Sequence, residues 1–178
     1  YKAPVTSSAA SAIAMGRGDY QLTSEDALHH ARAIVQATEL PVSADLENGF
    51  GHAPEVVAQT IRLAAEIGLA GGSIEDASQQ PDSPIYGFDQ AVERVAAAAE
   101  VVRHLAGQGR PFTLTARAEN FLNDKPDLDD TIRRLQAYEA AGADVLFAPG
   151  LPSLEAVKAV AGALGKPLSF MVGIPGKS

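Results

Sequence analysis

The chain has 178 residues, of which 46% are hydrophobic and 20% are charged, and its formal net charge is −8. This composition is typical of a globular domain that buries a core, whereas the acidic balance and the 6% of aromatic residues argue against nucleic acid or an anionic membrane as partner. The absence of cysteine excludes disulfides, thiolate metal sites and a cysteine nucleophile. No apolar run is long enough to span a bilayer, so we expect a cytoplasmic protein that acts on a small molecule.

Short apolar runs alternate with alanine-rich helical patterns along the whole length. The runs predict strands at Ala3–Ser7, Pro41–Glu47, Ala70–Glu75, Phe112–Arg117, Asp144–Ala148 and Leu168–Val172. The helical patterns predict helices at Thr23–Thr38, Pro54–Ile67, Phe88–Ala106, Leu128–Ala141 and Ser153–Leu164. Glycines placed just after three of these helices are typical stop signals.

This alternation predicts parallel βαβ units, and therefore an α/β fold that is either an open doubly wound sheet or a (β/α)8 barrel. No glycine-rich nucleotide-binding motif follows the first strand, which favours the barrel. The pattern yields about six strands, whereas a closed barrel needs eight. We therefore expect residues 1–178 to form a single, partial TIM-type barrel domain, and we expect the natural protein to be longer, because exposed sheet edges are disfavoured.

Acidic residues interrupt the predicted strands near their carboxyl ends. Side chains two residues apart share one face of a strand, so Asp45 and Glu47 project together, and Glu75 projects from the same face of the next strand. The following strand adds Arg117 and Glu119 on that face. Because active sites of barrel enzymes lie at the carboxyl ends of the strands, we expect these five side chains to converge there.

Clustered carboxylates repel one another unless a cation lies among them. An all-oxygen site with few protein ligands favours Mg²⁺ that keeps several waters, with Mn²⁺ as an alternative. Arg117 could then bind a substrate carboxylate or stabilise negative charge that develops during a reaction. The competing interpretation is that single acids cap the following helices, and we expect Asp76 to have only that role.

Four motifs in this order resemble those of the isocitrate lyase/phosphoenolpyruvate mutase superfamily. The segment "SADLENGFG" resembles its metal-binding motif, "SIED" its second metal strand, "TARAEN" its arginine-bearing strand, and "EAAGADVLFAPG" the helix and strand that follow. The resemblance extends from about Val5 to Gly173. It implies a (β/α)8 barrel whose Mg²⁺ holds a 2-oxo acid or its enolate, in a protein that forms a dimer or tetramer.

The resemblance also implies roles for individual residues. Asp45 matches the direct metal ligand, whereas Glu47 and Glu75 match acids that bind the ion largely through its waters. Arg117 matches the arginine that contacts substrate, and Asp19 an aspartate close to the reacting centre, although an ordinary loop aspartate is the alternative. Ser7, Ser8 and Ala9 match the loop that holds the substrate carboxylate. Glu119, in the arginine-bearing segment, is expected to bind substrate as well.

Departures from the family pattern reduce the number of family activities that we expect for this chain. The stretch after the second metal strand reads "DASQQPDSPIYGF" and lacks the cysteine of isocitrate and methylisocitrate lyases. Ala77 and Pro149 stand where phosphoenolpyruvate mutases carry lysine and histidine. We therefore expect an enzyme that cleaves or forms a C–C bond next to a 2-oxo acid, with P–C bond chemistry or a non-catalytic carboxylate-binding barrel as alternatives. The same stretch is either a mobile lid over the site or a plain surface insertion.

Overall fold

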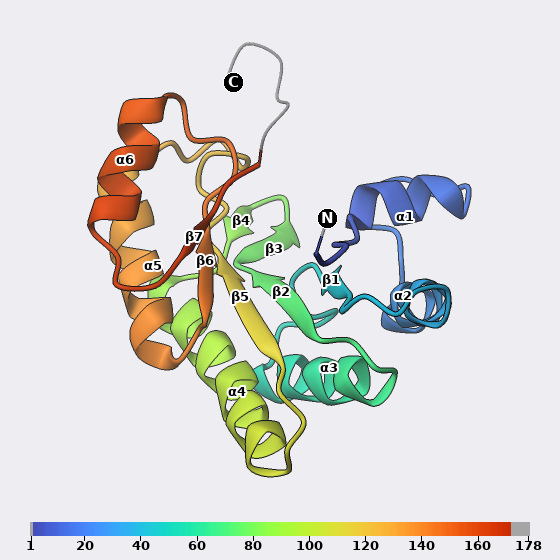
Figure 1. Ribbon diagram of the computed structural model, residues 1–178. Helices are drawn as coiled ribbons and strands as arrows, with labels where there is room; N and C mark the ends of the chain where they lie inside the picture. Colours follow the sequence, from blue (N-terminus) through green and yellow to red (C-terminus); the bar gives the residue numbers. More distant parts are fainter. Residues whose placement is uncertain (1, 172–178) are drawn as a thin grey trace.

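A five-stranded parallel sheet forms the centre of the structure, a computed structural model that describes residues 2–171 (Figure 1). The strands lie in the order β1-β2-β5-β6-β7, and every neighbouring pair is parallel. Their bounds are β1 Ser43–Asp45, β2 Gly71–Glu75, β5 Thr113–Arg117, β6 Val145–Phe147 and β7 Leu168–Ser169. A separate antiparallel hairpin pairs β3 (Ala77–Gln80) with β4 (Ser83–Ile85).

Helices alternate with the strands of the parallel sheet and cover one of its faces (Figure 1). Their bounds are α1 Ser8–Ala14, α2 Ser24–Gln36, α3 Pro54–Glu66, α4 Phe88–Gly107, α5 Leu128–Ala141 and α6 Leu154–Gly162. Helix α3 packs against β2, α4 against β5 and α5 against β6. The predicted α/β fold with a parallel sheet is therefore confirmed. Within residues 2–171, β1 and β7 do not pair with each other, so the described sheet is open.

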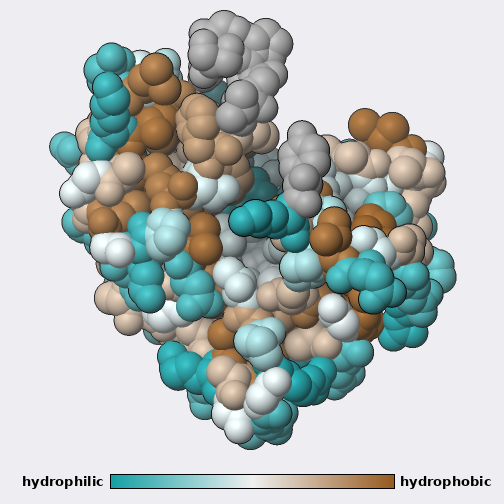
Figure 2. Space-filling view, viewed as in Figure 1, coloured by the Kyte–Doolittle hydropathy of each residue, from teal (hydrophilic) through white to brown (hydrophobic). Residues whose placement is uncertain are grey.

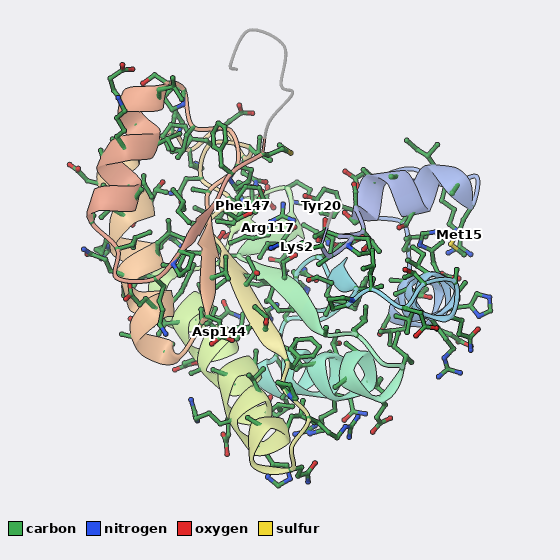
Figure 3. All side chains as sticks on the ribbon, in the orientation of Figure 1. Lys2, Met15, Tyr20, Arg117, Asp144 and Phe147 are labelled. Carbon is green, nitrogen blue, oxygen red and sulfur yellow. The ribbon has the colours of Figure 1, made fainter. Side chains whose placement is uncertain are left out.

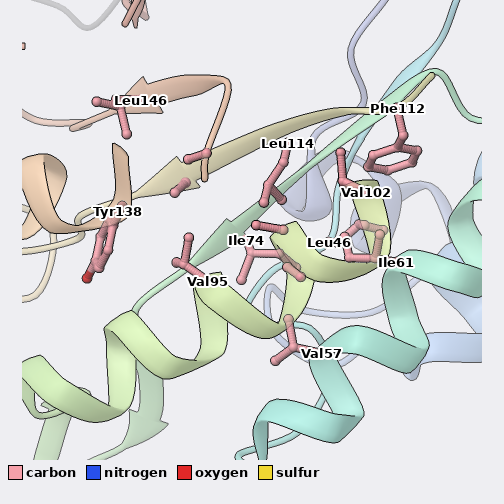
Figure 4. Close-up of a cluster of buried hydrophobic side chains, with 14 of the residues drawn as sticks. Leu46, Val57, Ile61, Ile74, Val95, Val102, Phe112, Leu114, Tyr138 and Leu146 are labelled. Carbon is pink, nitrogen blue, oxygen red and sulfur yellow. The ribbon is translucent and has the colours of Figure 1, made fainter. Parts of the chain in front are cut away.

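The hydrophobic core fills the space between the sheet and these helices, as Figure 4 shows. Leu46, Leu114 and Leu146 point from the sheet into this layer and are completely buried. Gly72 lies within it because a Cβ there would come 2.7 Å from the Leu46 side chain. The alternation that buries one side chain and turns the next to the opposite face is therefore the one that the sequence predicts. Across residues 2–171, none of the helices combines the length and apolar character that a membrane crossing needs.

One predicted element near the amino end needs correction, and one helix there was not predicted. The expected strand Ala3–Ser7 is reduced to a single parallel bridge between Val5 and Ser43. Ser7 instead caps the unpredicted helix α1, since its hydroxyl accepts a hydrogen bond from the amide of Ala10 at 3.4 Å. A serine followed by an alanine-rich run is a helix-start signal, and here it overrides the extended pattern.

Two further predictions differ from the structure in part. The expected strand Leu168–Val172 is present only as β7, and its last residue lies outside the described residues. The stretch interpreted as a lid or plain insertion contains the hairpin β3–β4, because Ala77 pairs with Ile85 and Gln80 with Ser83.

Asp76 does not cap a helix, contrary to the expectation from the sequence. It is 3% exposed and accepts hydrogen bonds from the Tyr138 hydroxyl at 2.6 Å and from Arg134 at 3.1 Å, both on α5. Its other carboxylate oxygen accepts the amide of Glu119 at 2.8 Å. The buried carboxylate thus ties α5 and the end of β5 to the end of β2.

This network predicts a stability effect for Tyr138→Phe. The change removes one donor from the buried Asp76 carboxylate and leaves the ring in place, so the free energy of unfolding should fall by about 1–3 kcal/mol. Arg133→Gln on the same helix is the control, because Arg133 forms an exposed pair with Asp130 that should contribute less than about 1 kcal/mol. Urea unfolding measures both, and equal effects would contradict the role of the network.

Candidate active site

Arg117 lies at the centre of a cluster of carboxylates at the carboxyl ends of the strands. Its guanidinium contacts Asp45 at 3.1 Å, Glu75 at 3.2 Å and Glu119 at 2.8 Å. Its Nε also donates to Glu119 at 2.8 Å. The Arg117 side chain is only 12% exposed, and it lies 5.2 Å from the centroid of the Phe147 ring. One arginine therefore joins acids from three strand ends.

The register of the parallel strands explains this convergence. Glu75 on β2 is the register partner of Arg117 on β5, which in turn pairs with Phe147 on β6. Asp45, at the end of β1, is the partner of Ser73. Figure 3 shows Arg117 and Phe147 close together near the centre of the view, while Asp144, just before β6, lies toward the opposite end of that strand. Parallel pairing thus places acids that are far apart in the sequence at one rim.

Glu47 reaches the cluster by a route other than strand alternation. Strand β1 ends at Asp45, and Glu47 follows in a left-handed backbone conformation with φ 49°. Its amide donates to the Asp45 carboxylate at 3.2 Å, and its carbonyl accepts the amide of Glu75 at 2.9 Å. The Glu47 carboxylate is 2% exposed and receives the side-chain amide of Gln79 at 3.0 Å.

The cluster has more negative than positive charge. Asp45, Glu47, Glu75 and Glu119 face the guanidinium of Arg117, and the three glutamates each leave one buried carboxylate oxygen without a hydrogen-bond partner. Buried polar atoms are rarely unpaired, and buried charges normally have a counterion. These oxygens are donors suited to Mg²⁺. Within residues 2–171, no group of three or more His, Asp or Glu side chains is arranged so that it could hold a metal ion.

Burial and mutual repulsion perturb the protonation of these acids. Burial raises the pKa of the Glu47 carboxyl from 4.5 to about 7, and the neighbouring Asp45 adds to the rise. Burial raises the pKa of Glu75 and of Glu119 as well, against the opposing effect of Arg117. Ionisation of the whole cluster is therefore unfavourable until a cation joins it.

The predicted carboxylate-binding loop and Asp19 lie at different distances from the cluster. Ser8 is in contact with it, since its amide and its hydroxyl approach the Asp45 carboxylate at 3.3 Å and 3.1 Å. Ser7 is used as the cap of α1, and Ala9 lies in the first turn of that helix. Asp19 is exposed, and its carboxylate accepts the amide of Tyr20 at 3.1 Å. Its charge contributes to the raised pKa of Glu47.

Two residues near the cluster could not be predicted from the sequence. Tyr20 has a left-handed φ of 58° and is 43% exposed. It lies close to Arg117 in Figure 3. Burial raises its pKa, and the charges of Glu75 and Glu119 raise it further. Gln79 stands in the polar hairpin, where no local pattern indicates a contact with Glu47.

A second polar group borders the cluster at the hairpin. The Tyr86 hydroxyl lies 2.7 Å from His52 Nδ1 and accepts the side-chain amide of Asn48 at 3.3 Å. The Arg94 guanidinium lies over the Tyr86 ring at 4.2 Å and donates to the Gly51 carbonyl at 2.7 Å. Contacts with Arg94 on α4 and with Tyr86, which directly follows the hairpin, thus hold the loop that follows β1.

Comparison with known proteins assigns the chain to a family. The sequence model of the phosphoenolpyruvate phosphomutase family matches residues 1–178. The oxaloacetate decarboxylase of Bradyrhizobium diazoefficiens is 34% identical over 167 residues, which cover 90% of this chain and 55% of that protein. The 2-methylisocitrate lyase of Escherichia coli is 30% identical over 152 residues, covering 82% of this chain and 49% of that enzyme.

Solved structures agree in fold. A crystallised protein from Burkholderia cenocepacia J2315, described only at the level of a lyase or mutase, is 51% identical with a TM-score of 0.95, over 100% of this chain and 63% of that one. Oxaloacetate acetylhydrolase, crystallised with its product oxalate, is 28% identical with a TM-score of 0.85, over 94% of this chain and 58% of that one. The chain thus spans about half the length of the curated relatives that it matches. The motifs, the sheet and the full-length family match together establish that this chain belongs to the phosphoenolpyruvate phosphomutase family, within the isocitrate lyase/phosphoenolpyruvate mutase superfamily.

Proposed function

We propose that this protein is a Mg²⁺-dependent enzyme that cleaves or forms a C–C bond next to the oxo group of a small 2-oxo or 2-hydroxy carboxylic acid. The observation that carries the proposal is the excess of buried carboxylate around Arg117, with three glutamate oxygens unpaired. The oxaloacetate decarboxylases and 2-methylisocitrate lyases among the relatives support an acid of this class. Oxaloacetate is accordingly the first substrate to test.

The cluster divides the work of the reaction among its residues. Asp45 would hold the ion directly, and Glu47 and Glu75 would hold it through its waters. When bound, the ion would supply positive charge that offsets the negative charge developing as the C–C bond breaks. Arg117 donates one hydrogen bond to Glu119 and forms ion pairs with Asp45 and Glu75, and its guanidinium would also donate to a substrate oxygen. Ser8 and the first turn of α1 would bind the substrate carboxylate.

The polar surroundings fit this division. We propose that Glu119 positions Arg117, because both of its contacts use the same carboxylate oxygen. Asp76 in turn fixes the Glu119 backbone from the buried side. Asp19 lies close enough to affect the charge of Glu47 and would act near the reacting centre. Preorganised charges of this kind stabilise a developing anion without rearrangement.

The fold in which the site acts is proposed to be a (β/α)8 barrel of which residues 1–178 form a partial, single domain. Support comes from the five parallel strands, which lie in sequence order. Exposed apolar side chains near the two edges of the sheet also support it. In Figure 2, apolar side chains gather over α1 and over α6, where Ile13 is 73% and Leu154 is 57% exposed. Further polypeptide or a partner subunit would cover these residues, in line with a homo-oligomer.

P–C bond chemistry is the second candidate, because the matching family is named for a phosphomutase. Incubation with phosphonopyruvate, followed by phosphorus NMR, distinguishes the two reactions. New phosphorus signals without turnover of oxaloacetate would favour the second candidate. Tight oxalate binding without turnover of either compound would favour a non-catalytic carboxylate-binding barrel.

The metal-site assignment predicts the behaviour of Asp45→Asn. The substitution keeps the size of the side chain but removes the negative charge proposed to contact the ion, so Mg²⁺ affinity should fall at least about tenfold, and Mg²⁺-dependent oxalate binding should fall with it. Asp82→Asn in the exposed turn between β3 and β4 is the matched control. Calorimetric titration of both variants measures the effect, and unchanged affinity in Asp45→Asn would remove the assignment.

The protonation of the acids predicts a pH effect on the metal-free protein. The folded-state pKa of Glu47, about 7, exceeds the ordinary value of 4.5, so its contribution to stability is present below about pH 4.5 and is lost as pH rises through 7. Glu75 and Glu119 act in the same sense. Thermal melting from pH 4.5 to 7.5 should show this decline, with a smaller decline in Glu47→Gln. Mg²⁺ should reverse the loss at neutral pH, and a decline insensitive to Mg²⁺ would contradict the prediction.

The central position of Arg117 predicts a catalytic effect for Arg117→Lys. Lysine keeps the charge but cannot contact three carboxylates and a substrate oxygen in one plane, so turnover of oxaloacetate should fall about a hundredfold or more. Arg133→Lys on the exposed side of α5 should leave turnover unchanged. Steady-state kinetics with Mg²⁺ measures both, and a loss below about threefold would exclude a central role for the guanidinium.

A further inference from the structure

Gln79, in the hairpin, is the only side chain among the described residues that is seen to hydrogen-bond to the Glu47 carboxylate. Its side-chain amide donates to Glu47 Oε2 at 3.0 Å, and Oε1 of the same carboxylate is buried without a partner. Glu47 is 2% exposed, whereas Gln79 is exposed. The contact therefore reaches from the surface hairpin into the buried part of the site.

The backbone at both ends of this contact has an unusual conformation. Glu47 has φ 49° and Gln79 has φ 61°, and neither residue is glycine. Such left-handed conformations are disfavoured for residues with a side chain, and they persist where the surrounding structure holds them in place. Because both partners of the hydrogen bond have this conformation, we infer that the surrounding structure holds the contact in place.

The hairpin is anchored independently of Gln79. The Gln80 amide donates to the Ser78 hydroxyl at 3.0 Å, and the Tyr86 amide donates to the Asp76 carbonyl at 2.9 Å where the hairpin returns to the sheet. The side-chain amide of Gln80 lies 3.3 Å from His52 Nε2. None of these contacts involves Glu47, so within the hairpin only the Gln79 side chain is seen to hydrogen-bond to it.

The chemistry of a carboxamide is well suited to a site that must still accept a cation. An amide N–H orients one carboxylate oxygen but brings no positive charge. A lysine or arginine at the same place would neutralise Glu47 and compete with the ion. Gln79 thus satisfies Oε2 and leaves both the charge of the carboxylate and its free Oε1 available.

We propose that Gln79 is a positioning residue of the cation site: its carboxamide fixes the Glu47 carboxylate so that the unpaired oxygen faces the ion or its water shell. The inference rests on the proposed function and deepens it, because it extends the site from the sheet to the β3–β4 hairpin. Groups that orient metal ligands in this way commonly change metal affinity by 10- to 100-fold when they are removed.

Calorimetric titration of Mg²⁺ into the protein tests this role. Gln79→Met removes the donor with little change in size and should weaken Mg²⁺ binding at least about tenfold. Gln80→Met, at the next position in the same hairpin, should stay within about twofold of the wild type because Gln80 contacts His52 and not the acids. Equal Mg²⁺ affinities for Gln79→Met and the wild type would overturn the inference while leaving the proposed function intact.

A second variant separates positioning from a merely structural contact. Gln79→Lys places a positive charge beside Glu47, so it should raise the melting temperature of the metal-free protein and reduce the further increase that Mg²⁺ produces. An unchanged Mg²⁺-dependent increase would count against the proposal, even if Gln79→Met failed to fold. No Mg²⁺ binding by the wild-type protein would overturn the proposed function, and this inference with it.

Discussion

The structure depends on one electrostatic constraint: three carboxylates contact a single guanidinium, and a fourth lies beside them, in a place that solvent hardly reaches. Arg117 contacts Asp45, Glu75 and Glu119, and Glu47 lies next to them without a cationic partner of its own. Bringing so many acids together is unfavourable, as their raised pKa values show. In the function proposed above, a bound cation and a reactive anion would use this charge, and the cluster would then serve function rather than stability.

The rest of the fold holds this unfavourable arrangement in place. The parallel register sets Glu75 beside Arg117, while the side chains that alternate with them fill the core against α3, α4 and α5. Behind the cluster, Asp76 joins the end of β2 to Tyr138 and Arg134 on α5. Asp76 differs from its neighbour Glu75 in having every carboxylate oxygen paired. The two adjacent acids therefore differ in their surroundings: Asp76 has a full set of partners, whereas Glu75 keeps one unpaired buried oxygen beside Arg117.

Much of the fold and the centre of the site could be predicted from the sequence because both follow local rules. Alternation within strands and parallel pairing between them are enough to bring Asp45, Glu75 and Arg117 to one rim. Side-chain contacts that follow from neither strand alternation nor parallel pairing could not be predicted in this way. The bond of Asp76 to Tyr138 spans 62 positions and that of Glu47 to Gln79 spans 32, and no periodicity indicates either partner. Helix α1 was missed although its serine cap and alanine-rich sequence were visible signals.

Glu47 lies beside the cluster for a reason that the sequence prediction did not include. Strand alternation placed it beside Asp45, yet β1 ends at Asp45, and the left-handed turn at Glu47 is what directs its carboxylate toward the cluster. A turn is easier to displace than a strand, so this acid needs support from elsewhere. The hairpin that follows β2 provides it through a neutral amide, which leaves the negative charge intact. The proposed cation site would therefore combine a rigid sheet on one side with a supported turn on the other.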